Sequence, residues 1–185
     1  MASNKREQLL ATALQLFYRE GYHGTGIDRI LAESGVAKMT LYKHFKSKDE
    51  LILAVLQLQH EQLGACLQAA LAGLAPREAI LAVFDGLQQL LGETEFCGCL
   101  FLHAAAEFHD RAHPIHRQAA AHKRALLEHF RRALQALGVT DADELAAQLQ
   151  FLCEGALSMA HVYGPGDQAR QARAAAVRLL QAAGH

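Results

Sequence analysis

The stretch that decides the fold runs from Thr25 to Leu51 and reads TGIDRILAESGVAKMTLYKHFKSKDEL. It contains a short segment with apolar residues at helical spacing, then Gly35, then a second short segment rich in Lys, Thr, Tyr and His. Two short helices joined by a turn that contains glycine are the outline of a helix-turn-helix. We therefore predict helices at about residues 26–34 and 38–44, and a third that begins at Lys48.

Two residue pairs in this stretch have the spacing of a capping box. Thr25 precedes Asp28 by three residues, and Ser47 precedes Glu50 by three. In a capping box, the first side chain accepts a hydrogen bond from the helix backbone and the second reaches back to the start of the helix. We expect Thr25 and Ser47 to cap the first and third of these helices.

The second short helix is the candidate DNA-reading element. Leu41 and Phe45 lie one turn apart and can anchor it inward, which leaves its polar side chains exposed. A generic three-helix packing unit would show the same spacing, but Lys, Thr, Tyr and His are side chains that contact phosphates and base edges. We predict that Thr40 contacts a base edge and that Lys38 contacts a base or a phosphate. Further contacts are expected from Lys43 and, to phosphates, from Tyr42, His44, Lys48 and Thr25.

Residues 7–56 resemble the N-terminal DNA-binding domain of the TetR family of bacterial transcriptional regulators. The matching pieces are ALQLFYREGYHGT, IDRILAESGVAKMTLYKHF and SKDEL, which follow one another in the order and spacing of that family. Two residues depart from its usual pattern, Ala37 in place of a capping Ser and Met39 in place of a Gly. A lost Ser cap costs about 1 kcal/mol, and we expect a well-packed Met39 to offset it.

The resemblance also implies a domain organisation and a function. It implies a helix-turn-helix DNA-binding domain at residues 1–47 and a helical domain for effector binding and dimerisation at residues 48–185. The implied protein is a homodimeric repressor that binds double-stranded operator DNA and is released by a small-molecule effector. Such a ligand acts by binding one of two arrangements of the long helices better than the other. We expect no enzymatic activity and no cofactor.

Composition agrees with a helical protein. Hydrophobic residues make up 51% of the 185 residues, Pro occurs three times and Trp is absent. This composition, rich in Ala and Leu, favours an all-α fold, and the periodic segments predict about nine helices. No basic leader precedes an apolar run, and no apolar stretch reaches the ~18 residues that span a bilayer. We therefore expect a cytoplasmic protein with no membrane partner.

Charge favours local DNA contact over general DNA coating. Residues 1–50 carry eight Lys or Arg and six acidic residues, whereas the whole chain has a net charge of −1. An excess of this size is a local patch and is too small for a protein that coats DNA.

Further helices flank the helix-turn-helix. The first runs from about Asn4 to Gly21, and the last two run to about Tyr163 and from Gln168 to Ala183. The last two have Ala-rich faces that suit close helix packing. In the TetR family, this is where two subunits form a four-helix bundle. The candidate dimer residues are Leu149, Leu152, Ala156, Met159, Ala172, Ala176 and Leu179.

The segment FCGCLFLHAAAEFHD, residues 96–110, is the most unusual part outside the helix-turn-helix. If it is helical, Cys99, His103 and Glu107 fall in line at i, i+4 and i+8. We predict that this line faces an effector pocket, although a surface His and Glu with ordinary partners would give the same pattern. An apolar or aromatic effector would suit a pocket built from Phe84, Leu100, Phe101, Phe108 and Phe130, and Cys99, His103 and Glu107 complete the candidate set.

Two alternative functions use the same segment. Cys97, Cys99 and His103 would make the regulator metal-responsive or thiol-responsive, since Zn²⁺ accepts sulfur and nitrogen ligands. On a regular helix, however, Cys97 and Cys99 point about 200° apart and cannot share one ion. A small metal-dependent hydrolase built on Cys99, His103 and Glu107 is the enzyme alternative, but the chain lacks the usual catalytic motifs. We therefore expect no bound metal, and no structural disulfide among the four cysteines.

Overall fold

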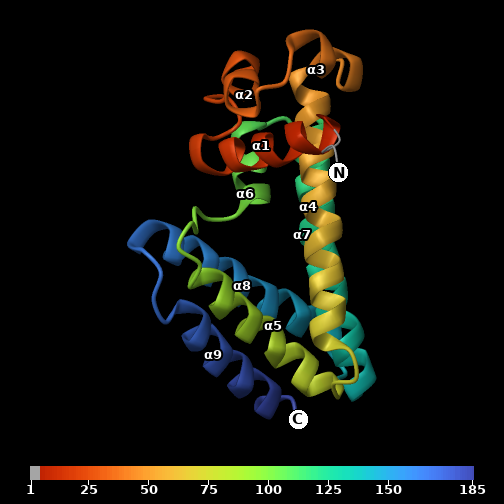
Figure 1. Cartoon of the computed structure of the whole chain (residues 1–185). Coiled ribbons are helices and arrows are strands. Elements are labelled where there is room, and N and C mark those ends of the chain that lie inside the picture. The colour runs from red at the N-terminus through yellow and green to blue at the C-terminus, as the bar shows by residue number, and fades with distance from the viewer. Residues whose placement is uncertain (1–4) are drawn as a thin grey trace. The chain divides into compact units, whose positions relative to one another are not determined.

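The computed structural model describes residues 5–185, and every regular element among them is an α-helix. The helices are α1 (Lys5–Glu20), α2 (Ile27–Ser34), α3 (Lys38–His44), α4 (Lys48–Leu71), α5 (Pro76–Leu91), α6 (Leu100–Glu107), α7 (Pro114–Leu137), α8 (Ala142–Tyr163) and α9 (Gln168–Ala182) (Figure 1). The predicted all-α fold of about nine helices is confirmed for this part of the chain. The expected helix start near Asn4 lies outside the described residues. Within residues 5–185, no helix is long and apolar enough to cross a membrane.

The chain divides into two compact units. The first contains the residues up to Leu63 together with Leu100–His122, and the second contains Gly64–Cys99 together with Lys123–His185. Helices α4 and α7 therefore contribute residues to both units. These units describe packing, and the functional boundary between residues 47 and 48 stays a prediction.

In the first unit, α1 packs against α2 and α3. Leu9, Ala13 and Phe17 recur at helical spacing and form a buried face of α1. Ile30 of α2 and Leu41 of α3 are fully buried. A shared apolar core therefore fixes the helix-turn-helix onto α1.

The turn between α2 and α3 is built on Gly35. Its φ of 63° lies in the left-handed region that favours glycine, and its N–H donates to the carbonyl of Leu31 at 2.9 Å. Val36 follows and is buried. The glycine ends α2, and the buried valine fixes the start of the next helix.

The caps of this unit differ in part from the predicted pairs. Gly26 rather than Thr25 precedes α2, and the Thr25 hydroxyl donates to the carbonyl of Gly21 at 2.7 Å. The predicted Thr25 cap is wrong, because that side chain is fully buried against the turn after α1. Ser47 does cap α4, since its Oγ accepts the Glu50 N–H at 3.1 Å.

In the second unit, α5, α8 and α9 pack on one another and share a core with part of α7 (Figure 1). Phe84 of α5 and Phe130 of α7 are fully buried, with ring centroids 6.1 Å apart. Ala160 of α8 and Ala176 of α9 are also buried. Short side chains at such positions let helices approach closely, which explains the Ala-rich composition of α8 and α9.

The segment at residues 96–110 is helical only in its middle. Helix α6 covers Leu100–Glu107, whereas Gly98 has a φ of 100° and residues 96–99 are not helical. A residue in the left-handed region interrupts a regular helix. The predicted alignment of Cys99 with His103 and Glu107 along one helix is therefore wrong, because Cys99 stands just before α6.

Candidate nucleic-acid interface and regulatory residues

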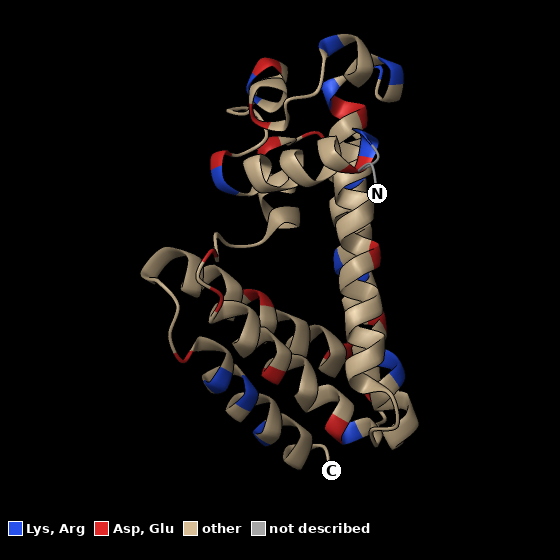
Figure 2. Cartoon of the chain, in the orientation of Figure 1, with Lys and Arg blue, Asp and Glu red and all other residues tan. Residues whose placement is uncertain are grey.

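Most of the predicted DNA-binding side chains lie on the exposed face of α3. Met39 is 83% exposed and Tyr42 is 44% exposed. Together with Thr40 and Lys43, they line an open hollow of about 460 Å³. Figure 2 shows that Lys and Arg gather on α3 and on the turn that follows it. This face combines amino and hydroxyl groups with one large apolar side chain.

The start of α3 has no side-chain cap. Ala37 occupies the N-cap position and offers no acceptor. We expected a well-packed Met39 to offset this loss, and that prediction is wrong, because Met39 faces solvent. Leu41 and Phe45 hold the helix instead, with 0% and 2% of their surface exposed. Met39 is consequently available for contacts outside the chain.

Two of the predicted cations lie at the first residues of helices. Lys38 Nζ lies 3.2 Å from Asp28 Oδ1, and both side chains are mostly exposed. An exposed pair of this kind contributes little to stability, so Lys38 can exchange its partner for a phosphate. Lys48 is the half-buried first residue of α4. Burial lowers the pKa of Lys48, against the opposing effect of Glu107 and Asp49.

Two further predicted phosphate contacts are placed differently. The Thr25 side chain is fully buried and donates within the chain, so a phosphate could reach only its backbone. His44 is half-buried at the end of α3, with its ring 6.3 Å from that of Phe45. The structure thus places Lys38, Thr40, Tyr42 and Lys43 together on α3. The Thr25 hydroxyl is buried and does not belong to this exposed group. The DNA contacts themselves stay predictions.

Glu107, predicted for an effector pocket, holds the loop that leads into the helix-turn-helix. Its Oε1 accepts the Tyr22 N–H at 2.8 Å, and its Oε2 accepts the His23 N–H at 2.6 Å. Burial raises the pKa of Glu107, but the His23 and Tyr22 donors lower it by more, so it ends below its ordinary value. The Tyr22 hydroxyl donates to the carbonyl of Leu100 at 2.9 Å, and Phe108 stacks on the His23 ring.

These contacts give α6 a role that sequence reasoning missed. Glu107 lies 84 positions from His23 in the chain, and no local pattern links residues so far apart. Three of the predicted pocket residues, Leu100, Glu107 and Phe108, contact the residue 22–23 loop within the first unit. Their side-chain and backbone groups fix that loop in the observed conformation.

The other predicted pocket residues are divided between the two units. Phe101 of the first unit stacks on His122 with ring centroids 3.6 Å apart, and His122 Nδ1 lies 3.0 Å from His60 Nδ1. His103 is half-buried on α6. Phe84 and Phe130 contact each other in the core of the second unit, which also contains Cys99. A joint effector pocket formed by these residues stays a prediction.

A thiol, an ammonium group and a carboxylate meet in the second unit. Lys123 Nζ lies 3.2 Å from Cys99 Sγ and 2.8 Å from each carboxylate oxygen of Glu154. Burial lowers the pKa of Lys123, but Cys99 and the Glu154 carboxylate raise it by more, so it ends above its ordinary value. No local sequence pattern indicates this grouping, because Lys123 lies 24 positions from Cys99 and 31 positions from Glu154.

No grouping of metal ligands accompanies these thiols. Among residues 5–185, no group of three or more His, Cys, Asp or Glu side chains is arranged to hold a metal ion. The four cysteines form no disulfide bond within the described part of the chain.

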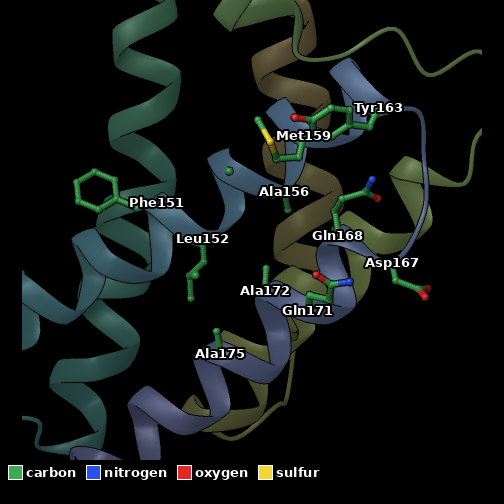
Figure 3. Close-up of a pocket in the computed structure, with 11 residues that line it drawn as sticks. Phe151, Leu152, Ala156, Met159, Tyr163, Asp167, Gln168, Gln171, Ala172 and Ala175 are labelled. Atoms are coloured by element: carbon green, nitrogen blue, oxygen red, sulfur yellow. The ribbon is translucent and has the colours of Figure 1, made fainter.

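The α8 helix carries an exposed apolar face. Phe151 is 71% exposed, Met159 is 42% exposed and Tyr163 is 79% exposed. Of the predicted dimer residues, Leu149 and Ala176 are fully buried in the core of their own unit, while Met159 belongs to this face. An open hollow of about 550 Å³ between α8 and α9 is lined by residues that include Phe151, Leu152, Ala156, Met159, Tyr163 and Ala172 (Figure 3). Sequence reasoning missed Phe151 and Tyr163, although their spacing from Met159 is helical.

Two family models match the chain in succession. Residues 9–55 match the model for bacterial regulatory proteins of the tetR family, and residues 76–176 match the tetracyclin repressor-like C-terminal domain. The chain belongs to the TetR family of bacterial transcriptional regulators. It is therefore a DNA-binding regulator whose C-terminal domain is of the dimerisation and ligand-binding kind, and TetR-family regulators are not enzymes.

A solved TetR-family structure supports the assignment over nearly the whole chain, and curated HTH-type regulators match about half of it. The crystal structure of a TetR-family transcriptional regulator from Streptomyces coelicolor has a TM-score of 0.93 and 34% identity, covering 98% of this chain and 96% of that one. The HTH-type transcriptional activator FasR of Mycolicibacterium smegmatis is 40% identical over 89 residues, which span 45% of this chain and 41% of FasR. The HTH-type transcriptional repressor NemR of Escherichia coli is 33% identical over 110 residues, covering 57% of this chain and 54% of NemR.

Proposed function

We propose that this TetR-family regulator binds a specific DNA duplex as a homodimer and represses transcription until a small molecule releases it. The exposed face of α3 carries the proposal, because Met39, Thr40, Tyr42 and Lys43 all reach solvent from one short helix. Residues 1–47 would form the DNA-reading domain, and residues 48–185 the regulatory domain.

The side chains of α3 suit different parts of a duplex. The Thr40 hydroxyl can donate to or accept from a base edge, and the thioether of Met39 can contact the methyl group of thymine. Lys38 and Tyr42 offer a cation and a hydroxyl to the phosphates on either side of the groove. Lys48, at the first turn of α4, adds a cation beside exposed backbone N–H groups, which is a favourable place for a phosphate.

Two copies of the chain are expected to act together. The charge excess of residues 1–50 is small, with eight cations and six acids, so one copy would hold phosphates weakly. Helix-turn-helix dimers read two half-sites about 34–36 Å apart. The exposed Phe151, Met159 and Tyr163 side chains of α8 offer an apolar surface for the second subunit. Burying such a surface between copies is favourable.

The direction of regulation rests on the family resemblance. One curated relative is named an activator and another a repressor, so a reporter assay with and without candidate effectors decides between them. We assign the effector to residues 48–185, which contain the tetracyclin repressor-like C-terminal domain. An effector that binds one helix arrangement better than the other shifts the population of the DNA-binding form.

Selection of duplexes from a random-sequence DNA library tests the proposal. The purified dimer should enrich an inverted repeat with half-sites about one helical turn apart. Enrichment of no motif, or of a motif that a Thr40→Ala, Lys43→Ala variant enriches equally, would contradict the assignment of α3 as the reading helix.

A further inference from the structure

We propose that Cys99 is a modification site for small carbon electrophiles, and that its alkylation lowers the affinity of the regulator for DNA. Cys99 Sγ lies 3.2 Å from the Lys123 ammonium group, which Glu154 holds in place through both carboxylate oxygens at 2.8 Å. The thiolate is the reactive form of cysteine, and an adjacent cation favours it. The second half of this proposal rests on the proposed DNA binding.

The four thiols of the chain have different surroundings. Cys153 is buried, and burial raises its pKa to about 12, so it stays protonated and shielded. Cys66 is exposed on α4, and Cys97 is half-buried on the other side of Gly98. Cys99 combines partial exposure with the ammonium contact. The structure therefore assigns Cys99 as the thiol prepared for reaction, ahead of the more exposed Cys66.

The expected reagent class is the α,β-unsaturated carbonyl compounds. Cys99 Sγ forms a bond with the β-carbon while the carbon–carbon π bond breaks, and the proton lost from the thiol ends on the α-carbon. The reaction needs no oxidant, no reductant and no leaving group. Lys123 stays an ammonium group throughout, held by Glu154, and acts as a positioning residue that stabilises the anionic sulfur.

The position of Cys99 in the chain connects this reaction to the DNA-reading helices. The next residue is Leu100, whose carbonyl accepts the hydroxyl of the buried Tyr22 at 2.9 Å. Helix α6 starts at Leu100 and ends at Glu107, which holds the backbone of Tyr22 and His23. An adduct on Cys99 adds bulk directly before α6 and converts the thiol beside Lys123 into a thioether. Both changes disturb the helix that fixes the loop before α2.

The first test measures alkylation of each cysteine by methyl vinyl ketone at pH 7, using peptide mass spectrometry. Cys99 should react faster than Cys66, and Lys123→Met should slow Cys99 about tenfold because the thiolate loses its cation. Lys123→Arg should retain the rate, which a purely structural role for Lys123 would not predict. The double variant Lys123→Met, Glu154→Gln leaves no unpaired charge and provides the same comparison if the single variant does not fold. A Cys99 rate equal to that of Cys66, or unaffected by loss of the Lys123 charge, would overturn the site.

The second test compares DNA binding before and after alkylation in a Cys66→Ser, Cys97→Ser background. With Cys99 present, alkylation should weaken binding to the selected duplex at least about tenfold, the scale of a typical coupling between two sites. With Cys99→Ser added, the reagent should have no effect. If the untreated protein binds and the adduct binds equally well, the regulatory role is wrong. If the untreated protein binds no duplex, the proposed function fails instead, and the alkylation rates still decide the Cys99 site.

Discussion

The Glu107 carboxylate holds both the backbone and the ring of His23. Its Oε2 accepts the His23 N–H at 2.6 Å and lies 2.7 Å from ring Nδ1. The same carboxylate accepts the neighbouring N–H through Oε1. A carboxylate at the end of α6 therefore fixes the loop between α1 and α2, and this relationship gives a test of how the first unit is stabilised.

Replacing Glu107 by Gln should destabilise the first unit by about 2 kcal/mol at pH 7, because charge-assisted hydrogen bonds are replaced by weaker neutral ones. The pKa of Glu107 is lowered in the folded state from its ordinary value of 4.5. The stabilisation is therefore complete above that value and is lost as the pH falls through the lower folded-state pKa. Denaturant unfolding of both proteins from pH 7 to pH 3 measures the difference in free energy, which should shrink below about pH 4.5.

Glu93→Gln is the matched control, since it neutralises an exposed carboxyl in a loop of the second unit. It should change the free energy of unfolding little at any pH. A difference between wild type and Glu107→Gln that stays constant down to pH 3 would show that the carboxylate charge does not hold the loop.

Met39 should contribute to sequence preference. Its side chain is 83% exposed on α3, and apolar side chains in the major groove contact the thymine methyl group. Replacing thymine by uracil at the contacted position of the selected duplex should weaken wild-type binding by about 1 kcal/mol and leave Met39→Ala unaffected. Leu74→Ala, a change at an exposed loop residue of the second unit, should retain the wild-type sensitivity. Equal sensitivity in Met39→Ala at every thymine would remove Met39 from the interface.

The apolar face of α8 should hold the dimer together. Phe151→Arg combined with Met159→Arg places two charges where the proposed interface buries apolar surface, and such charges are costly when buried without partners. Analytical ultracentrifugation should show a folded monomer, with helix content retained by circular dichroism. Leu74→Arg introduces one such charge at an exposed residue outside α8 and should leave the dimer intact. A double variant that remains dimeric would place the interface elsewhere.

Local pattern was enough to predict the helix-turn-helix. Gly35, Leu41 and Phe45 are close in sequence, and their roles follow from turn chemistry and helical spacing. Two predictions in this region, for Thr25 and for Met39, were wrong, and each has a local cause. Thr25 has the spacing of a cap, but the Gly21 carbonyl takes its hydroxyl. Met39 was predicted to pack inward, but Leu41 and Phe45 already occupy the core-facing positions of this segment.

The regulatory half was less predictable, because its key contacts join distant residues. Cys99, Lys123 and Glu154 come together from a loop, α7 and α8, and no spacing rule relates them. The helical alignment of Cys99 with Glu107 failed for a local reason, the left-handed φ of Gly98. Phe151 on α8 could have been predicted, since it lies at helical spacing from Met159. The prediction instead relied on Ala-rich helix faces, which the structure buries.

The salt dependence of DNA binding by Tyr42→Phe and Lys48→Ala tests the central claim most directly. Fluorescence anisotropy with the selected duplex should show weaker binding by both variants, about threefold or more for a lost hydrogen bond, while both remain dimeric. Lys48→Ala should also lower the slope of log affinity against log salt by about 1 per lost phosphate contact. Arg178→Ala removes a cation from an exposed residue of α9 and should bind as wild type. Unchanged affinity and salt slope in both Tyr42→Phe and Lys48→Ala would contradict the docking of α3 and the start of α4 on DNA.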